Sequence, residues 1–507
     1  MVGNLGNLMK KPKKMEEKKL KVLVAAAECA PFVKVGGSAD VIGSLPKALH
    51  KLGVDVRVVI PCYKEVKNLK LKAKSCSSKF KVKFGGTEEV AVYESKLPGS
   101  EVPIYFLENQ EYLSGGGVYF SKDAVASEQK EIERFAFFSK AVGEFVKKGE
   151  WKPDVVHCND WHTGLVPGLL KLEAGGSKLE RMLEARSWKS SVQHRASFQA
   201  SSVKRPVSIF TIHNLANQGF SELGLLKNFD SVTQESELIK WDAEDDNLDL
   251  MLQGITASDV LNTVSPTYAK EILTPEFGEG LHEVLKAREG RLYGILNGID
   301  DQIWDPRTDS KIEFNYSLKD GLAGKVGNKV YLQKELGLAA SPERPVIGII
   351  TRLAEQKGLD LLLDIFEEVL GLGAQLVILG VGDPEMEQEL KVKSEKLKVE
   401  KNFAFINRFD EELAHRIYAG SDLFLMPSKF EPCGLVQIIA MRYGALPIVR
   451  ATGGLKDTVE NGETGFVFEE YSPEALFAVI ERAVGRFGVK NVEFRQMIAR
   501  AMRADFS

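Results

Sequence analysis

The sequence predicts an α/β protein made of two facing, doubly wound domains, each a mainly parallel sheet covered by helices on both faces. Short apolar runs typical of strands alternate with helical patterns along the 507 residues. This alternation occurs twice, on either side of an irregular segment at 299–345. Open sheets of this kind bind ligands beyond the carboxyl ends of their strands, so we expect the active site in the cleft between the two domains.

The first half begins with a strand, a helix and a second strand. Residues 20–27 are apolar apart from Lys21, which is typical of a strand buried on both faces. A second apolar run, 54–60, ends at Pro61. Between them, helical spacing places four apolar side chains on one face: Ile42, Leu45, Leu49 and Leu52. Further strands are expected over 104–107, 154–157 and 208–213, and a long helix over 128–148.

The second half repeats this scheme. Strands are expected over 346–351, 375–379, 403–406, 422–426 and 446–449. Helices are expected over 358–370, 384–397, 411–419 and 434–443. We therefore divide the chain into a basic tail (1–20), a first domain (21–305) with a polar surface insertion at 175–205, a second domain (306–490) and a C-terminal helix (491–507).

Composition narrows the classes of partner. Lys and Arg number 67 and Asp and Glu 71, for a net charge of −4, which favours neither nucleic acid nor an acidic membrane as a partner. No apolar run reaches the roughly 18 residues of a membrane span. The five cysteines are scattered without C-x-x-C spacing, which fits a reducing, cytoplasmic setting. The lysine-rich tail lacks the Arg/Ser bias of a transit peptide, so plastid import is less expected.

A glycine loop follows the first strand. Lys34, Gly36 and Gly37 precede the first helix, where backbone N–H groups and a lysine suit a phosphate. The loop is neither G-x-G-x-x-G nor a Walker loop. A tight strand-to-helix turn that uses glycine only for its geometry explains it equally well.

A pair of cations follows the first strand of the second half. Arg352 and Lys357 lie before the helix expected from Gly358. Two cations there can bind a diphosphate and stabilise it as a leaving group. The alternative is two solvated charges, but cations at a helix start oppose the helix dipole, which favours the ligand interpretation.

Polar residues end three other strands. Glu431 can accept a hydrogen bond from a sugar hydroxyl or support a cationic transition state, or it can merely stabilise the start of the next helix. For Cys433 the favoured interpretation is a packing thiol, and the alternative is a residue that lines the site. In the first half, His157-Cys158-Asn159-Asp160-Trp161-His162 and Thr211-Ile212-His213-Asn214 end two strands, which indicates a polar cleft. Neither has metal-ligand spacing, so we expect no catalytic metal and no cofactor. No G-x-S-x-G elbow is present.

Together these segments resemble the glycogen/starch synthase family. The motifs stand in family order between about Lys21 and Phe468, and they include KVGGSADVIGSLPKAL, HCNDWHTGLVP, TIHNLANQG, GILNGID, ITRLAEQKGLDLL and PSKFEPCGLVQIIAMRYGALPIV. The resemblance implies two Rossmann-type domains in the GT-B architecture. It also implies a hexosyltransferase that moves glucose from ADP-glucose to the non-reducing end of an α-1,4-glucan with retained configuration.

The resemblance also implies roles for individual residues. Lys34 with the backbone of Gly36 and Gly37 would contact the donor phosphates, and Arg352 with Lys357 would hold the diphosphate. Glu431 would bind the glucose. The remaining implied contacts are His162 and Asn297 along the glucose pocket, Asn214 as a further substrate-binding residue, Cys433 and Gly434 against the sugar, and Phe409 stacked on adenine in place of the family's tyrosine.

Some positions depart from the family pattern. Ser38, Asn217 and Arg408 replace a usual leucine, tyrosine and glycine, and Ser507 lies near the point where family members continue with a segment that returns to the first domain. Ser38, Asn217 and the C-terminal end keep one alternative open, a non-catalytic glucan-binding or priming relative. A second alternative, an enzyme that makes a small disaccharide or glycoside, rests on the shared architecture alone.

Overall fold

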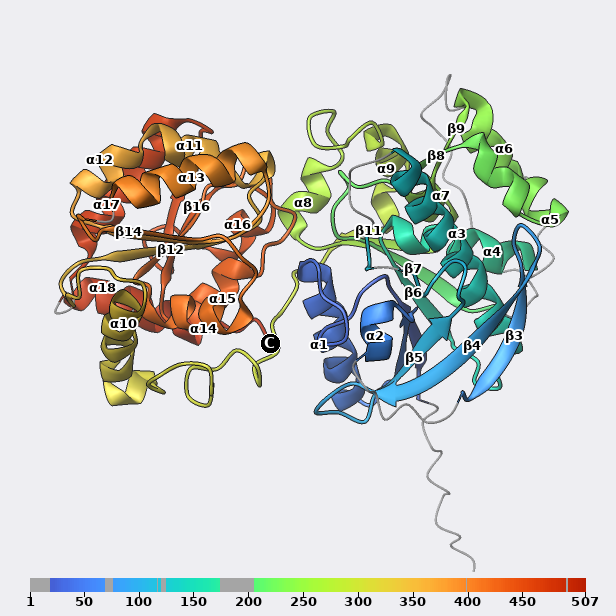
Figure 1. Cartoon of the computed structure of the whole chain (residues 1–507). Helices are drawn as coiled ribbons and strands as arrows, with labels where there is room; N and C mark the ends of the chain where they lie inside the picture. Colours follow the sequence, from blue (N-terminus) through green and yellow to red (C-terminus); the bar gives the residue numbers. More distant parts are fainter. Residues whose placement is uncertain are drawn as a thin grey trace, which may run out of the picture.

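The two predicted domains lie side by side in the computed structural model (Figure 1). It describes residues 19–68, 76–115, 117–119, 125–173, 205–397, 399–488 and 491–507. The predicted basic tail and polar insertion lie outside the described residues, apart from their last members. One of these, Arg205, is not part of a loose surface loop: its guanidinium donates to both oxygens of Asp259, at 2.7 and 2.8 Å.

The first domain is built on a sheet in the order β11-β10-β7-β6-β1-β2-β5-β4-β3. Its strands pair in parallel except at β4, which is antiparallel to both neighbours. The strands are β1 (Lys21–Ala25), β2 (Asp55–Pro61), β3 (Ser78–Lys83), β4 (Thr87–Lys96), β5 (Pro103–Glu108), β6 (Val155–Asn159), β7 (Val207–Ile212), β10 (Val260–Thr263) and β11 (Leu292–Gly294). The short strands β8 (Phe220–Glu222) and β9 (Asn247–Asp249) pair separately.

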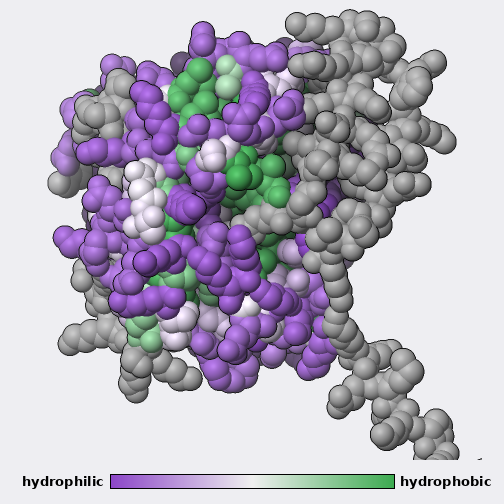
Figure 2. Space-filling model, turned by 90° about the vertical axis from the view of Figure 1, so that its right-hand side faces the viewer, coloured by the Kyte–Doolittle hydropathy of each residue, from purple (hydrophilic) through white to green (hydrophobic). Residues whose placement is uncertain are grey.

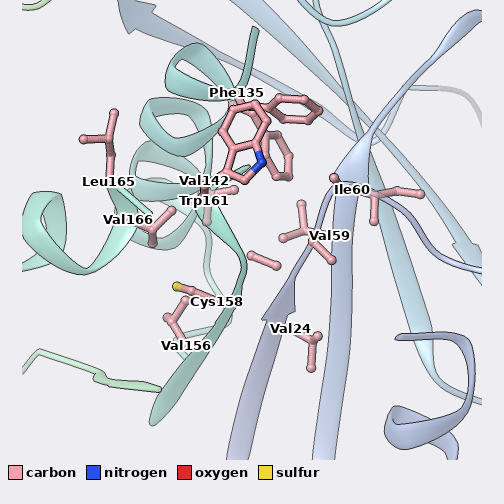
Figure 3. Packing of buried hydrophobic residues seen from close by; sticks show 14 of the residues in the cluster. Val24, Val59, Ile60, Phe135, Val142, Val156, Cys158, Trp161, Leu165 and Val166 are labelled. Atoms are coloured by element: carbon pink, nitrogen blue, oxygen red, sulfur yellow. The ribbon is translucent and has the colours of Figure 1, made fainter. Parts of the chain in front are cut away.

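Helices cover this sheet and bury its apolar faces. They are α1 (Gly37–Lys51), α2 (Lys64–Asn68), α3 (Val125–Lys148), α4 (Val166–Glu173), α5 (Ser231–Gln234), α6 (Glu237–Asp242), α7 (Leu250–Ala257), α8 (Pro266–Glu271) and α9 (His282–Ala287). Figure 3 shows Val59 of β2 on the side of the sheet where Phe135 and Val142 of α3 lie. The prediction for α1 was wrong at one residue, because Leu52 follows the last turn and is 81% exposed.

The hairpin of β3 and β4 was not predicted. In β3 the lysines are exposed while Val82 is buried, which is the period-two pattern of a half-buried edge strand. The hairpin extends the sheet at the side of the molecule that Figure 2 faces, where hydrophilic side chains predominate and hydrophobic ones show in hollows between them.

The second domain has an all-parallel sheet in the order β14-β13-β12-β15-β16-β17. Its strands are β12 (Val346–Ile350), β13 (Gln375–Leu379), β14 (Phe403–Ile406), β15 (Leu423–Met426), β16 (Leu446–Arg450) and β17 (Phe466–Phe468). Its helices are α10 (Ala323–Glu335), α11 (Leu359–Asp364), α12 (Phe366–Gly371), α13 (Pro384–Lys396), α14 (Glu411–Gly420), α15 (Val436–Arg442), α16 (Gly453–Thr458), α17 (Pro473–Arg486) and α18 (Val492–Arg503). The single helix predicted over 358–370 is divided at Ile365 into α11 and α12.

Both sheets reverse their strand order at their first strand. In the first sheet β1 lies between β2 and β6, and in the second β12 lies between β13 and β15. A reversal of this kind opens a crevice at the carboxyl ends of the strands, where ligands bind. The glycine loop follows β1 and the loop of Arg352 and Lys357 follows β12, so each lies at such a reversal.

The segment between the domains is fixed on several sides. Lys47 of α1 pairs with Asp300, with Nζ 3.0 Å from Oδ2. Ile299 N–H donates to Phe506 O at 2.8 Å, which brings residues after α18 back to the junction. The predicted boundary at 305/306 stays a prediction, although Trp304 already packs in the second core. Within the described ranges, no helix is both long and apolar enough to span a bilayer.

Candidate active site

The glycine loop is shaped by a buried carboxylate. Glu28, which follows β1 and is 3% exposed, accepts hydrogen bonds from Val35 N at 2.6 Å and Gly36 N at 3.2 Å. It also accepts one from the hydroxyl of Ser38. Burial raises the pKa of Glu28, and these three donors lower it. The N–H of Gly36 is therefore occupied within the loop, so the N–H groups that can serve a ligand are those at the start of α1, from Gly37 onward.

Ser38 is thus more than a departure from the family pattern. A leucine cannot donate to Glu28, so the serine gives this loop a hydrogen bond that the usual residue lacks. The same turn orients Lys34, whose Nζ lies 2.8 Å from Asp40 Oδ1. The lysine is held over the start of α1 before any ligand binds.

In the second domain, Lys357 and Glu431 meet at the strand reversal. Lys357 Nζ lies 2.6 Å from Glu431 Oε2, and Glu431 is only 6% exposed. Ser428 Oγ donates to the same carboxylate oxygen at 3.3 Å. Arg352, by contrast, is exposed, and no described residue pairs with its guanidinium. At this strand reversal Lys357 is therefore neutralised by Glu431, whereas Arg352 has no ion-pair partner among the described residues.

Backbone contacts hold these two loops together. Lys429 N donates to Gln356 O at 2.9 Å, and Gln356 Nε2 donates to Phe430 O at 3.2 Å. Gly358 has a φ of +67°, and a Cβ there would lie 2.0 Å from Pro427 O. Only glycine permits this approach, which brings Lys357 within reach of Glu431.

The two domains meet at the glycine loop and the Glu431 loop. A Cβ on Gly37 would lie 3.7 Å from Leu435 Cδ1, so the start of α1 faces the segment just after Gly434. The backbone N–H of Asn297 donates to the Cys433 thiol, whose pKa burial raises to about 12. Cys433 is 4% exposed and packs with the first domain's core, so it is a packing thiol at the interface.

His162 lies in a small pocket of the first domain. Its ring stacks on Trp161 at 4.1 Å, and Nε2 lies 3.2 Å from Tyr119 Oη. Burial, with a smaller effect of His213, lowers the pKa of His162 to about 3, so its imidazole is neutral near pH 7. The pocket is lined by Ala26, Ala27, Glu28, Ser38, Ile42, Tyr119, Asn159, Asp160 and His162.

Tyr119 was missed in the sequence analysis. It belongs to an irregular loop rather than to a strand end, and Arg134 of α3 positions that loop by donating to Gly117 O at 2.6 Å and Val118 O at 2.9 Å. Arg134 is 1% exposed, and a buried arginine needs such acceptors. No local signal in the sequence indicates this contact.

Asp160 ties the ends of β6 and β7 together. Its Oδ1 accepts from His213 N at 2.7 Å, and the backbone N–H of Asn214 also donates to its carboxylate. Burial raises the pKa of Asp160 to about 7. The amide oxygen of Asn214 accepts from Ala216 N at 3.1 Å, so that oxygen is occupied within its own turn.

Phe409 lies on the surface beyond β14 and is 72% exposed. The neighbouring strand β13 is followed by Val381, which is 40% exposed. Arg408 donates to Asp410 Oδ2 at 3.0 and 2.8 Å, which turns its charge towards that carboxylate. The exposed ring at the carboxyl end of a parallel strand offers an apolar face that suits a flat ligand. Across the part of the chain that is described, no group of His, Cys, Asp or Glu could hold a metal ion.

Comparisons with known proteins agree with this architecture. The starch synthase catalytic domain family matches residues 21–183 and 188–287, and the glycosyl transferases group 1 family matches 337–497. A glycogen synthase of Geotalea daltonii is 39% identical over 497 residues, and one of Clostridium botulinum (strain Alaska E43 / Type E3) is 42% identical over 501; each alignment covers 96% of both chains.

A solved structure extends the likeness to three dimensions. The catalytic domain of starch synthase IV from Arabidopsis thaliana, bound to ADP and acarbose, superposes with a TM-score of 0.82 at 32% identity and covers 96% of both chains. This chain therefore belongs to the glycogen and starch synthase family of GT-B glycosyltransferases.

Proposed function

We propose that this protein is a hexosyltransferase that moves glucose from ADP-glucose to the non-reducing end of an α-1,4-glucan, with retained anomeric configuration. One observation carries the proposal: Gly37 in the glycine loop of one domain lies against Leu435 of the other, four residues after Glu431, which pairs with Lys357. The relatives named glycogen synthase and the ADP-bound starch synthase support this choice of substrates.

The diphosphate that leaves during transfer is the ligand that we assign to Arg352, which has no ion-pair partner among the described residues. As the glycosidic bond to the phosphate breaks, negative charge gathers on the diphosphate. Arg352 is exposed and unpaired among the described residues, and Lys357 lies beside it in the same loop. N–H groups from Gly37 onward, with Lys34, approach from the first domain. Together they stabilise the departing charge without acting as acids or bases.

The glucose binds between Glu431 and His162. Glu431 already uses one oxygen on Lys357 and Ser428, which leaves Oε1 for a sugar hydroxyl. A carboxylate fixed there also favours positive charge at the anomeric carbon. Because the pKa of His162 is lowered to about 3, its neutral ring contributes a hydrogen bond rather than a charge.

The base of the donor is proposed to stack on Phe409, with Val381 beside it. The exposed ring would lose water contact when a flat base covers it. Stacking alone does not distinguish adenine from uracil, so the choice of ADP-glucose rests on the family.

The test is a transfer assay with two donors. The purified chain is mixed with maltoheptaose and either ADP-glucose or UDP-glucose, and nucleotide release is followed together with product length. Growth by single glucose units with ADP-glucose is expected. Growth with UDP-glucose alone would overturn the donor, and glucan binding without transfer from either donor would favour the non-catalytic relative.

A further inference from the structure

A reciprocal set of hydrogen bonds joins α8 of the first domain to α16 of the second. Glu271, the last residue of α8, accepts from Gly453 N at 3.0 Å and from Thr452 Oγ1 at 3.2 Å. In the opposite sense, Asp457 of α16 accepts from Thr267 N at 2.7 Å and from Thr267 Oγ1 at 2.6 Å. Figure 1 shows the two helices side by side between the domains.

The contact of Glu271 continues directly into the Glu431 loop. Gly454 N donates to Glu431 O at 3.1 Å and to Pro432 O at 3.2 Å. A Cβ on Gly453 would lie 1.9 Å from Glu431 O, so this backbone is packed against the loop without room for a side chain. One short stretch of backbone therefore separates a first-domain carboxylate from the residue that pairs with Lys357.

We propose that Glu271 is a positioning residue for glucosyl transfer: through Gly453 and Gly454 it holds the backbone of Glu431 in register with the glycine loop and His162 of the first domain. The contact between Asp457 and Thr267 fixes the same helix junction, and among the described residues no hydrogen bond joins Asp457 to the Glu431 loop. Variants of these two contacts, that of Glu271 and that of Asp457, therefore distinguish a positioning role from simple attachment of one domain to the other.

This arrangement predicts an effect on turnover rather than on donor affinity. Most of the groups that we assign to the nucleotide, namely Arg352, Lys357 and Phe409, belong to the second domain and move with it. A shift of the Glu431 loop relative to the first domain leaves these second-domain contacts intact, loosens only the contacts of Lys34 and the start of α1 with the diphosphate, and misaligns the two halves of the transition state. Misplacement by about 1 Å can lower a rate by about a hundredfold.

Replacing the carboxylate of Glu271 by an amide distinguishes an effect on stability from an effect on positioning. Within the described structure, Glu271 Oε2 is buried without a hydrogen-bond partner. In Glu271→Gln, the amide oxygen can still accept from Gly453, while the NH2 group occupies the place of the unpartnered oxygen. A buried donor without an acceptor destabilises the fold, so this variant is expected to unfold more easily yet keep its turnover.

The kinetic test compares Glu271→Ala, Glu271→Gln and Asp457→Ala. It rests on the proposed transfer from ADP-glucose. Glu271→Ala is expected to lower kcat by about tenfold or more, with KM for ADP-glucose changed less than about threefold. Glu271→Gln and Asp457→Ala are expected to keep kcat within about threefold of the parent, despite lower melting temperatures. Equal kcat losses in Glu271→Ala and Asp457→Ala would overturn the positioning role.

A second measurement does not depend on activity, so failure of the proposed function and failure of this inference are distinguishable. Hydrogen–deuterium exchange is followed in peptides that cover 429–434, 452–458 and 265–270. Glu271→Ala is expected to speed exchange in the first two peptides, and Asp457→Ala in the last two without a change at 429–434. Unchanged exchange at 429–434 in Glu271→Ala would refute the coupling, whether or not the parent transfers glucose.

Discussion

Lys357 and Glu431, 74 positions apart in the chain, form an ion pair where the second sheet reverses its strand order, with Nζ 2.6 Å from Oε2. The lysine follows β12 and the glutamate follows the adjacent strand β15. Their side chains are 18% and 8% exposed, so the pair is largely removed from water. The contact therefore serves the fold as well as the proposed chemistry.

Separating these two contributions requires a double-mutant cycle. Lys357→Met leaves the Glu431 charge buried without its partner, which is expected to lower stability by up to about 3 kcal/mol. The double variant Lys357→Met with Glu431→Gln removes both charges, so most of that stability is expected to return. Turnover is not expected to return, because both proposed contacts to the donor are lost. Denaturant unfolding and the ADP-release assay measure the two effects.

Glu355→Gln is the matched control for this cycle. Glu355 pairs with Lys429 at 2.8 Å in a neighbouring but exposed contact, and exposed pairs contribute little. We expect activity and stability to stay near those of the parent. If Glu431→Gln alone lowered kcat less than about tenfold, or about 1.4 kcal/mol of barrier, its assigned role would be wrong.

Gly358→Ala is expected to disrupt the Lys357 loop. The new methyl would lie 2.0 Å from Pro427 O at a φ of +67°, so the loop must move away from β15. Gly373→Ala is the control, because its φ is +81° but no atom lies within 4 Å of the added carbon. Its cost should be limited to backbone strain of about 1 kcal/mol. Activity lost equally in both variants would contradict the close-approach argument.

Phe409→Ala should weaken donor binding without affecting the fold. The ring is 72% exposed, so its removal costs little core packing. Lost stacking is expected to raise KM for ADP-glucose by about fivefold to tenfold, at about 1 kcal/mol for one aromatic contact. Phe409→Tyr keeps the aromatic face and should bind the donor as the parent does. Equal KM values for the alanine and tyrosine variants would remove Phe409 from the nucleotide site.

Acid sensitivity should come in part from His157. Desolvation, with the nearby His213, lowers its pKa from 6.5 to about 4. Between those values the unfolded chain binds a proton that the folded chain does not, so stability is lost as pH falls below about 6.5. The slope is about 1.4 kcal/mol per pH unit, or about 2 kcal/mol by pH 5.

His157→Gln is expected to remove this part of the slope, while the buried His162, whose pKa is also lowered, keeps its own part. The glutamine keeps a donor for Thr211, whose Oγ1 lies 2.6 Å from His157 Nε2. The free energy of unfolding is measured from pH 5 to 8 for the parent, His157→Gln and His50→Gln. His50 is exposed near the end of α1, so its replacement should leave the parent's slope in place. A parent-like slope in His157→Gln would show that other groups set the acid sensitivity.

Local patterns in the sequence determined the fold class of this protein and its division into two domains. Apolar runs and helical spacing were sufficient for two sheets with helices on both faces, because burial of these segments depends mainly on their own residues. Since parallel strands end at one edge, the positions of Arg352, Lys357 and Glu431 after the carboxyl ends of two strands also followed from the sequence. The β3–β4 hairpin was missed, because alternating lysines were not interpreted as an edge strand.

The tertiary structure alone decided which groups meet. Glu28 accepts from Ser38, Tyr119 contacts His162, and Glu271 reaches Gly453 across the domain junction. Each contact joins residues that local patterning treats independently, and in each contact one partner, Glu28, Tyr119 or Glu271, lies on a loop or at a helix end, where periodicity gives no signal. Burial then sets the charge state, as it does for His162, whose imidazole is kept neutral by surroundings that the linear sequence does not show.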